Sequence, residues 1–182
     1  MGARLTFAPV TSASWSDFEA LFEAPGGPKY CWCMAWRASP SEIKEIGKAS
    51  RKPLLKDRVD HGTTVGLVGS LAGEPVAWVS IAPRETYRDL GGPDALPDER
   101  IWSLACLYLK RAHRSAGLGR EMLEAGIIYA RDGGARIVEA YPVDPESPSY
   151  RFMGFVPAFE RLGFVPVGMA GSRRHVMRLP LA

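Results

Sequence analysis

The sequence predicts an α/β protein with a mixed β-sheet, and three observations support this fold class. Patterns typical of strands alternate along the 182 residues with segments whose apolar residues have helical spacing. No internal repeat is present, and no linker is long enough to divide the chain. We therefore expect residues 1–182 to form a single domain.

The first half of the chain should begin with a strand and a helix. Residues 4–10 alternate between polar and apolar side chains, and Trp15, Phe18, Leu21 and Phe22 follow at helical spacing. Polar helices and a hairpin come next. The expected elements are a strand at 4–10, a helix at 12–23, one or two helices at 39–62 with a break near Pro53, and strands at 64–71 and 75–82 that turn at 72–74.

The second half follows a long connection, residues 84–100, that is rich in Gly and Pro. After it comes an apolar run and then a helix, stopped at 132–134, whose buried face is Leu118, Met122, Leu123, Ile127 and Ala130. The remaining elements are short. In order, we expect a strand at 101–109, the helix, a strand at 136–143, a short helix at 157–163, and strands at 164–168 and 173–181.

Composition indicates where in the cell the protein occurs and which classes of partner it is not expected to bind. A net charge of +3 is too weak to imply nucleic acid unless the charges gather on one face. Three cysteines, an odd number, argue against a disulfide framework and for a reducing compartment. No apolar run has the length of a membrane span, and the first ten residues lack a signal-peptide core. We expect a cytoplasmic protein with no membrane partner.

The stretch LACLYLKRAHRSAGLGREML, residues 104–123, carries the strongest functional signal. A strand that passes through Gly117 and Gly119 into a helix presents free N–H groups and the positive end of the helix dipole. Both features, with the neighbouring arginines, favour a phosphate-bearing ligand. The alternative is a turn with a solvated basic rim. The dinucleotide fingerprint fails at Met122, and the Gly-Lys-Ser/Thr of a P-loop is absent.

The pattern RxxGxG, formed by Arg114, Gly117 and Gly119, resembles the GNAT superfamily of N-acetyltransferases. The order of elements and the segment FERLGF, residues 159–164, resemble the same family. The resemblance implies a mixed, mostly antiparallel, twisted sheet of about seven strands, flanked by helices and with splayed central strands. It also implies an enzyme that uses acetyl-CoA as cosubstrate and transfers the acetyl group to a primary amine by direct attack on the thioester.

The resemblance also assigns the residues that hold acetyl-CoA. In the family, the strand before the loop bonds the pantetheine arm, and the loop binds the pyrophosphate. Asp144 stands where the family often has a cofactor-contacting asparagine. The expected acetyl-CoA contacts are Leu107, Tyr108, Leu109, Arg114, Ser115, Ala116, Gly117, Leu118, Gly119, Arg120 and Asp144.

The expected catalytic residue is Glu139, a carboxylate on a strand with apolar neighbours. Such a carboxylate is costly unless it is paired, exposed in a cleft or functional, and it aligns with a carboxylate that some GNAT members use as general base. The alternative is a glutamate paired for structural reasons, and Asp144 is a second candidate. Phe159 replaces the family's usual tyrosine acid, so Tyr150, Tyr141 or water is left to protonate the thiolate.

The segment KYCWCMAWR, residues 29–37, has the most unusual composition in the chain. Two cysteines at CxC spacing make a poor zinc site without further ligands, so we expect no metal. Tyr30, Trp32 and Trp36 either wall the acceptor site or form a packed aromatic cluster. A bacterial GNAT subgroup with a similar Cys-Trp-Cys segment is the most similar group.

Two other functions stay open from the sequence. An inert acyl-CoA-binding regulator is favoured by Phe159, and a nucleic-acid-binding module is suggested by the six cations of residues 44–58. Acidic residues interspersed in that stretch favour a solvated helical face, so we expect no nucleic acid partner. The resemblance implies that a homodimer is possible, and the acceptor is not specified.

Overall fold

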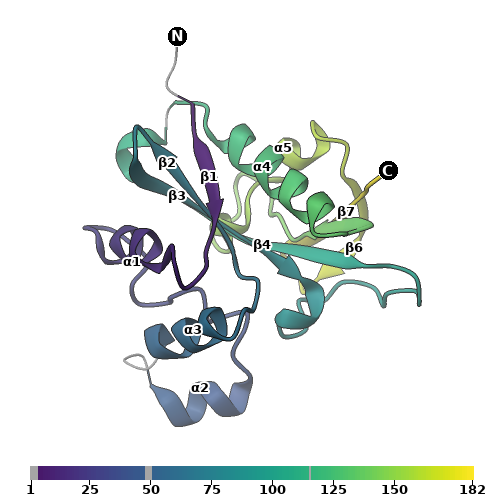
Figure 1. The fold of residues 1–182 in the computed structure, drawn as a ribbon. Coiled ribbons are helices and arrows are strands. Elements are labelled where there is room, and N and C mark those ends of the chain that lie inside the picture. Colours follow the sequence, from purple (N-terminus) through teal and green to yellow (C-terminus); the bar gives the residue numbers. More distant parts are fainter. Residues whose placement is uncertain (1–3, 48–50, 115) are drawn as a thin grey trace.

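The computed structural model describes residues 4–47, 51–114 and 116–182. They form one seven-stranded sheet in the order β1-β2-β3-β4-β5-β7-β6 (Figure 1). Neighbouring strands are antiparallel except β4 and β5, which are parallel. This confirms the predicted α/β fold with a mixed, mostly antiparallel sheet.

The strands and helices occur in the predicted order. The strands are β1 (Thr6–Pro9), β2 (Gly66–Leu71), β3 (Glu74–Pro83), β4 (Ile101–Leu109), β5 (Ile137–Ala140), β6 (Val165–Ala170) and β7 (Arg174–Pro180). The helices are α1 (Trp15–Glu23), α2 (Pro40–Ile46), α3 (Arg51–Asp60), α4 (Gly119–Asp132) and α5 (Val156–Glu160). Short 3-10 turns are η2 (Arg84–Thr86), η3 (Arg111–His113) and η4 (Arg151–Met153).

Two local predictions can be compared with the structure in detail. The hairpin turns at Ala72 and Gly73, whose φ angles of 48° and 83° suit a tight two-residue turn. The helical stretch at 39–62 is divided into α2, which ends at Ile46, and α3, which begins at Arg51, so the division lies a few residues before Pro53. That proline lies in the first turn of α3, where its missing N–H removes no helical hydrogen bond.

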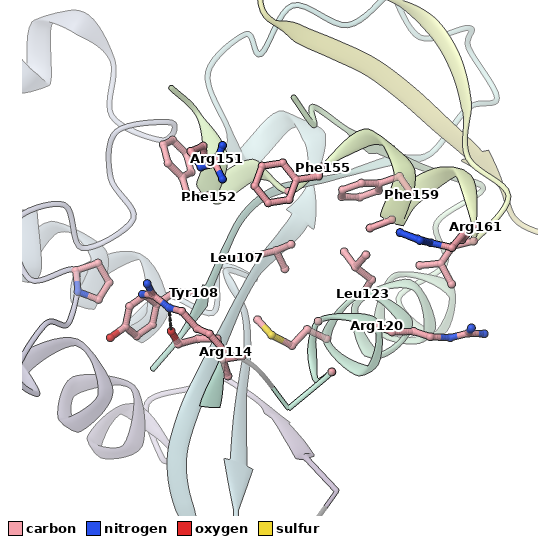
Figure 2. A pocket seen from close by; sticks show the side chains of 18 of the residues that line it. Leu107, Tyr108, Arg114, Arg120, Leu123, Arg151, Phe152, Phe155, Phe159 and Arg161 are labelled. Atoms are coloured by element: carbon pink, nitrogen blue, oxygen red, sulfur yellow. Dashed lines mark hydrogen bonds between the residues drawn. The ribbon is translucent and has the colours of Figure 1, made fainter. Parts of the chain in front are cut away.

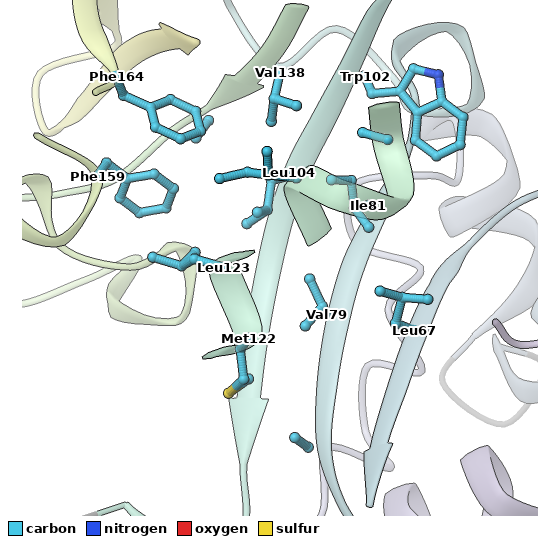
Figure 3. Close-up of a cluster of buried hydrophobic side chains, with 14 of the residues drawn as sticks. Leu67, Val79, Ile81, Trp102, Leu104, Met122, Leu123, Val138, Phe159 and Phe164 are labelled. Carbon is cyan, nitrogen blue, oxygen red and sulfur yellow. The ribbon is translucent and has the colours of Figure 1, made fainter. Parts of the chain in front are cut away.

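Hydrophobic cores lie on both faces of the sheet. On one face, α4 packs its predicted apolar side chains against Val79, Ile81 and Leu104 (Figure 3). On the other face, α1 and α3 pack with Trp32 and Trp78 in a second core, and Tyr141 belongs to a third. Because side chains alternate along a strand, β4 contributes to cores on both faces.

The central strands separate part-way along their length. β4 pairs with β5 only where residues 101–104 lie beside residues 137–140. β4 then continues to Leu109 along β3, with a register shift between Ser80 and Ile81. The second half of β4 therefore has a strand neighbour on one side only, and this opening positions the candidate site. No helix in the described residues is long and apolar enough to cross a membrane.

Candidate active site

A cleft of about 890 Å³ opens where β4 and β5 separate. Figure 2 shows Leu107 in its middle, Phe155 and Phe159 along one wall, and arginines around its rim. The volume lies in the range of ordinary small-molecule sites. The lining comes from β4, the loop before α4, the first turns of α4, η4 and α5, and the connection after α1.

The floor of the cleft is the unpaired half of β4. Leu107, Tyr108 and Leu109 line it, and the polar backbone groups that face away from β3 have no β5 partner there. The Arg114 Nε donates to the Leu109 carbonyl oxygen at 2.9 Å, and the Tyr108 hydroxyl donates to the Gly26 carbonyl oxygen at 3.2 Å. The cleft thus offers an extended strand edge to a ligand.

The loop that follows β4 ends in a helix N-terminus without a side-chain cap. Gly117 has a φ of 72°, which disfavours other residues, and α4 begins at Gly119. A Cβ built on either glycine would meet no described atom within 4 Å. Packing against the protein therefore does not explain these glycines. They leave open space in front of N–H groups at the positive end of the helix dipole.

Charge in the cleft is of one sign. Arg114, Arg120, Arg151 and Arg161 all line it, and all four are exposed. Among the described lining residues there is no carboxylate. Arg120 also pairs with Glu124 on the surface of α4 at 2.7 Å, a solvent-screened contact. The rim is therefore suited to an anionic ligand.

The wall opposite β4 is aromatic. Phe159 of α5 is fully buried and meets the Phe164 ring edge to face at 5.1 Å. Arg151 lies over the Phe155 ring at 4.7 Å. Gly154 has a φ of 88°, and a Cβ there would approach the Phe159 ring to 2.6 Å. This wall can contact an apolar chain but offers no hydroxyl at position 159.

Most of the predicted acetyl-CoA contacts surround this cleft, but three of the described ones do not line it. Ala116 lies outside the lining, and the Leu118 side chain is buried in the core under α4. Asp144 is exposed and lies 3.0 Å from the His175 Nε2. Ser115 falls outside the described residues. The predicted residues that line the cleft are Leu107, Tyr108, Leu109, Arg114, Gly117, Gly119 and Arg120.

Glu139 lies outside the lining of the cleft, inside a buried polar cluster. Its carboxylate accepts hydrogen bonds from the Tyr141 hydroxyl at 2.6 Å and the Arg178 Nε at 2.7 Å. Arg84 is 3.6 Å away, and Arg84 and Arg178 also hold carbonyl oxygens of residues 92–93. The Glu139 side chain is fully buried. These are the surroundings of a paired structural carboxylate, the alternative that the sequence left open.

The two tyrosines considered as general acid also lie outside the lining. Tyr141 is buried and hydrogen-bonded to Glu139 and, at 2.7 Å, to Ser103. Burial and the neighbouring Glu139 carboxylate raise the pKa of Tyr141 well above its ordinary value. Tyr150 stands on the surface beside Trp36. The tyrosines that line the cleft are Tyr30 and Tyr108.

The aromatic residues of the Cys-Trp-Cys segment differ in their surroundings: one belongs to a packed core, and another lines the cleft. Trp32 is buried and packs against Trp15, Phe18 and Phe22 in the core. Tyr30 is 68% exposed and lines the cleft. All three cysteines are free, and the described residues contain no cluster of three or more His, Cys, Asp or Glu side chains suited to a metal.

Several lining residues were missed at the sequence level. Gly26 and Pro28 come from the connection after α1, and Arg151, Phe152, Phe155 and Arg161 come from η4 and α5. Phe152 and Phe155 stand out in the sequence just before the predicted helix, but no local pattern shows that this segment faces the cleft. No local sequence pattern predicts that Gly26 and Pro28 reach the cleft, since this depends on the contact of Tyr108 with a residue distant in the chain.

Comparison with known proteins agrees with this geometry. A sequence profile described as "Acetyltransferase (GNAT) family" matches residues 15–164. The chain belongs to the GNAT acetyltransferase family. The match covers β4, the glycine loop, α4 and α5, so this GNAT chain is an acetyl-CoA-dependent acyltransferase by family. No curated protein matches the sequence.

Solved structures share the fold at low sequence identity. YncA from Salmonella typhimurium, described as a putative acetyltransferase with acetyl-CoA, is 16% identical, with a TM-score of 0.57 over 98% of this chain and 94% of that one. The PaiA N-acetyltransferase from Thermoplasma acidophilum, in complex with coenzyme A, is 14% identical, with a TM-score of 0.55 over the whole of both chains. A ribosomal-protein-alanine N-acetyltransferase from Brucella melitensis is 17% identical, with a TM-score of 0.57 over 97% of this GNAT chain and 99% of that one.

Proposed function

We propose that the cleft binds acetyl-CoA and that the protein transfers the acetyl group to a primary amine. The observation that carries this proposal is the meeting of an unpaired strand edge at residues 107–109 with an uncapped helix N-terminus at Gly119. Acetyl-CoA has both an amide-bearing arm and a pyrophosphate, and the two features suit those groups respectively. Two of the similar structures are described with acetyl-CoA or coenzyme A.

The residues present fit such a ligand at each part of the cleft. The open space at Gly117 and Gly119 leaves room for a phosphate to approach backbone N–H groups. Exposed arginines without a lining carboxylate favour the several negative charges of the nucleotide. Leu107, Phe155 and Ala158 give the middle of the cleft an apolar surface that suits the arm.

Bound acetyl-CoA supplies an activated acyl thioester. The chain contributes the β4 edge, which orients the arm, and the apolar wall at Phe155 and Phe159, which excludes water from it. Phe159 cannot donate a proton to the departing thiolate. A thiolate with a pKa near 8.5 is a tolerable leaving group, so solvent can meet this need without a positioned acid.

The general-base role of Glu139 stays a prediction. As a base, Glu139 would accept the ammonium proton directly or through water, and Glu139→Gln would lower turnover by about 10²-fold without weakening acetyl-CoA binding. As a structural partner, the same change would lower stability and leave turnover per folded molecule nearly unchanged. Measuring kcat and urea unfolding on one preparation separates the two roles.

We expect the acceptor to enter past two aromatic residues of the cleft lining, Tyr30 and Phe152. Both side chains are exposed, at 68% and 43%. Their aromatic faces suit the apolar part of an amine. Cytoplasmic location, bacterial origin and a homodimer remain predictions.

A second candidate, an inert acyl-CoA-binding regulator, is favoured by the absence of a hydroxyl at Phe159. The nucleic-acid alternative is weaker, because cations of the basic stretch are engaged with acids: Lys52 with Glu19 and Glu23, Lys56 with Asp60, and Arg58 with Glu42. These pairs support the predicted solvated face, and we propose no nucleic acid partner.

The test has two steps. Isothermal titration with acetyl-CoA should show one site, and free-thiol release should then follow for at least one member of a panel of amines, amino acids and peptides. Binding without thiol release above the rate of uncatalysed hydrolysis would favour the regulator. Absence of binding would contradict both candidates.

A further inference from the structure

Arg37 carries a buried positive charge between the core of α1 and the sheet. The side chain is 5% exposed. One guanidinium nitrogen, Nη1, donates to the Cys33 carbonyl oxygen at 2.8 Å. The other, Nη2, donates to the Val65 carbonyl oxygen at 2.7 Å and to the Ser80 and Tyr87 hydroxyl oxygens, each at 3.0 Å. All of these partners are formally neutral.

No carboxylate of the described residues forms an ion pair with Arg37, and its Nε has no hydrogen-bond partner among them. A buried charge without a counter-charge is strongly unfavourable, so a nearby group is expected to be ionised. The Tyr87 ring stacks on the guanidinium at 4.4 Å. Burial raises the pKa of Tyr87 to about 12, so its phenol stays protonated near neutral pH.

Two thiols are the remaining candidates for the anion. Cys33 is buried, and its Sγ accepts a hydrogen bond from the Trp78 Nε1 at 3.4 Å. Cys106 is the β4 partner of Ser80, whose hydroxyl binds Arg37. Since Trp78 and Ser80 are two residues apart on β3, they share a face, and Cys106 lies beside them on that face. The two cysteines therefore converge on Arg37 from different segments.

The Cys33 sulfur acts as a hydrogen-bond acceptor, a role that a thiolate fills better than a thiol. An indole N–H can only donate, so Trp78 fixes the Cys33 sulfur as an acceptor. The pKa of Cys33 is well below its usual range, because the Cys106 side chain hydrogen-bonds to it and Arg37 lies nearby. The pKa of Cys106 is well above its usual range, because of that hydrogen bond and burial. These shifts favour a thiolate at Cys33 and a thiol at Cys106.

We propose that Cys33 and Cys106 form a thiolate–thiol pair beside Arg37 and are a site of oxidation to a disulfide by small hydroperoxides. The Cys33 thiolate attacks a peroxide oxygen, the O–O bond breaks, and Cys33 becomes a sulfenic acid. The Cys106 sulfur then attacks the Cys33 sulfur and expels the hydroxyl as water. With hydrogen peroxide, two thiols and one peroxide give one disulfide and two waters. This proposal does not depend on acetyl transfer.

Access and location favour this pair over Cys31. Cys106 is half-buried and shares its face of β4 with Tyr108, which lines the cleft, so a small oxidant can approach along that face. Burial and the neighbouring Cys33 raise the pKa of Cys31, which makes it a poor thiolate. Cys31 therefore serves as the internal control.

Peptide mapping tests the pairing directly. The reduced protein is treated with stoichiometric hydrogen peroxide, blocked with iodoacetamide and digested with trypsin without reduction. Cleavage after Lys29, Arg37, Arg100 and Lys110 separates the cysteines into two peptides. We expect a crosslinked species that joins residues 30–37 to residues 101–110. The Cys31→Ser variant should retain this crosslink, and the Cys33→Ser and Cys106→Ser variants should lose it.

Other outcomes would overturn the proposal. They are a disulfide confined to residues 30–37, oxidation shared equally by the three thiols, or full alkylation of all three after peroxide. If a cysteine variant fails to fold, the pH dependence of the peroxide reaction rate of the wild-type protein tests the proposal instead. The groups that face Cys33 and can titrate or carry charge are Cys31, Arg37, Tyr87 and Cys106.

Because the pKa of Cys33 is lowered, its thiolate forms at a lower pH than that of an ordinary thiol. The peroxide rate should therefore rise less steeply between pH 7 and 8 than the rate of an ordinary thiol does. A rate that rises about 10-fold over that range is the behaviour of an ordinary thiol with a pKa near 8.5 and would contradict the proposal.

Discussion

The cleft and the cluster around Glu139 both lie where β4 and β5 separate, but they use arginine in opposite ways. In the Glu139 cluster, which comprises Glu139, Tyr141, Ser103, Arg84 and Arg178, the cations enclose one buried carboxylate. In the cleft, the arginines are exposed and no carboxylate of the described lining meets them.

The difference shows how one residue type serves two purposes. The guanidinium groups of the Glu139 cluster already have partners, since they bind the Glu139 carboxylate and the carbonyl oxygens of residues 92–93. These bonds hold the long connection before β4 against the Glu139 carboxylate of β5. Those of the cleft keep donors available to a ligand. A substitution in the cluster should therefore change stability, and one in the cleft should change binding.

The largest expected effect comes from Glu139→Gln. This change leaves Arg84 and Arg178 without their buried anion, and the loss of one partner of a buried pair destabilises by about 3–5 kcal/mol. Urea unfolding followed by fluorescence should show this loss, while the acetyl-CoA affinity of the folded variant stays within about 2-fold of wild type.

Glu99→Gln is the matched control for the cluster. Glu99 also contacts Arg178, at 3.7 Å, but it is partly exposed. Its replacement should lower the free energy of unfolding by less than about 1 kcal/mol, as for other solvent-screened pairs. If both variants lost the same free energy of unfolding, Glu139 would contribute no more to stability than a partly exposed ion pair. If Glu139→Gln were as stable as wild type, Glu139 would have no structural role.

The second effect is on the cleft side, with Gly119→Asp. The new carboxylate fits sterically, because no described atom lies within 4 Å of a Cβ there. It places a negative charge at the helix N-terminus where the pyrophosphate is expected. Such repulsion amounts to several kcal/mol, so calorimetry should show at least about a 100-fold loss of acetyl-CoA affinity.

Gly168→Asp controls for the added charge and bulk. Gly168 of β6 likewise has nothing within 4 Å of a Cβ and lacks a left-handed φ, but it lies outside the cleft lining. Its acetyl-CoA affinity should match wild type. Unchanged affinity in Gly119→Asp would refute the loop as the pyrophosphate site.

The smallest expected effect is that of Arg161→Gln. Arg161 lies on the cleft rim and is exposed, so its attraction to a phosphate is screened by salt. We expect about a 5-fold weaker affinity for acetyl-CoA, about 1 kcal/mol, that diminishes as ionic strength rises. Arg131→Gln, on the exposed last turn of α4, should bind as wild type does. An equal weakening in both variants would indicate a general charge effect.

Local patterns account for much of the fold and the glycine loop. The strand at 101–109 and the buried face of α4 follow from side-chain periodicity over a few residues. Gly117 is also explained locally, because its left-handed φ favours glycine. The contribution of Arg151 and Phe152 to the cleft could not be predicted in this way, since it depends on how distant segments pack.

Trp32 and Glu139 show the same limit. The sequence allowed Trp32 to line the acceptor site or to belong to a packed aromatic cluster. Only its packing against α1 in the folded structure shows that it belongs to the core. Glu139 is an unusual carboxylate in an apolar strand, which the sequence reveals. Its partners Arg84 and Arg178 are distant in the chain, so its pairing becomes visible only in the folded structure.

Hydrogen exchange of the wild-type protein with and without acetyl-CoA compares the two regions in one measurement. At a ligand concentration about 100-fold above Kd, residues 107–109 and 116–120 should exchange up to about 100-fold more slowly. Residues 84–93, which are held by the Glu139 cluster, should exchange at an unchanged rate. Unchanged exchange at 107–109 and 116–120, with protection confined to another part of the chain, would contradict acetyl-CoA binding along the open edge of β4.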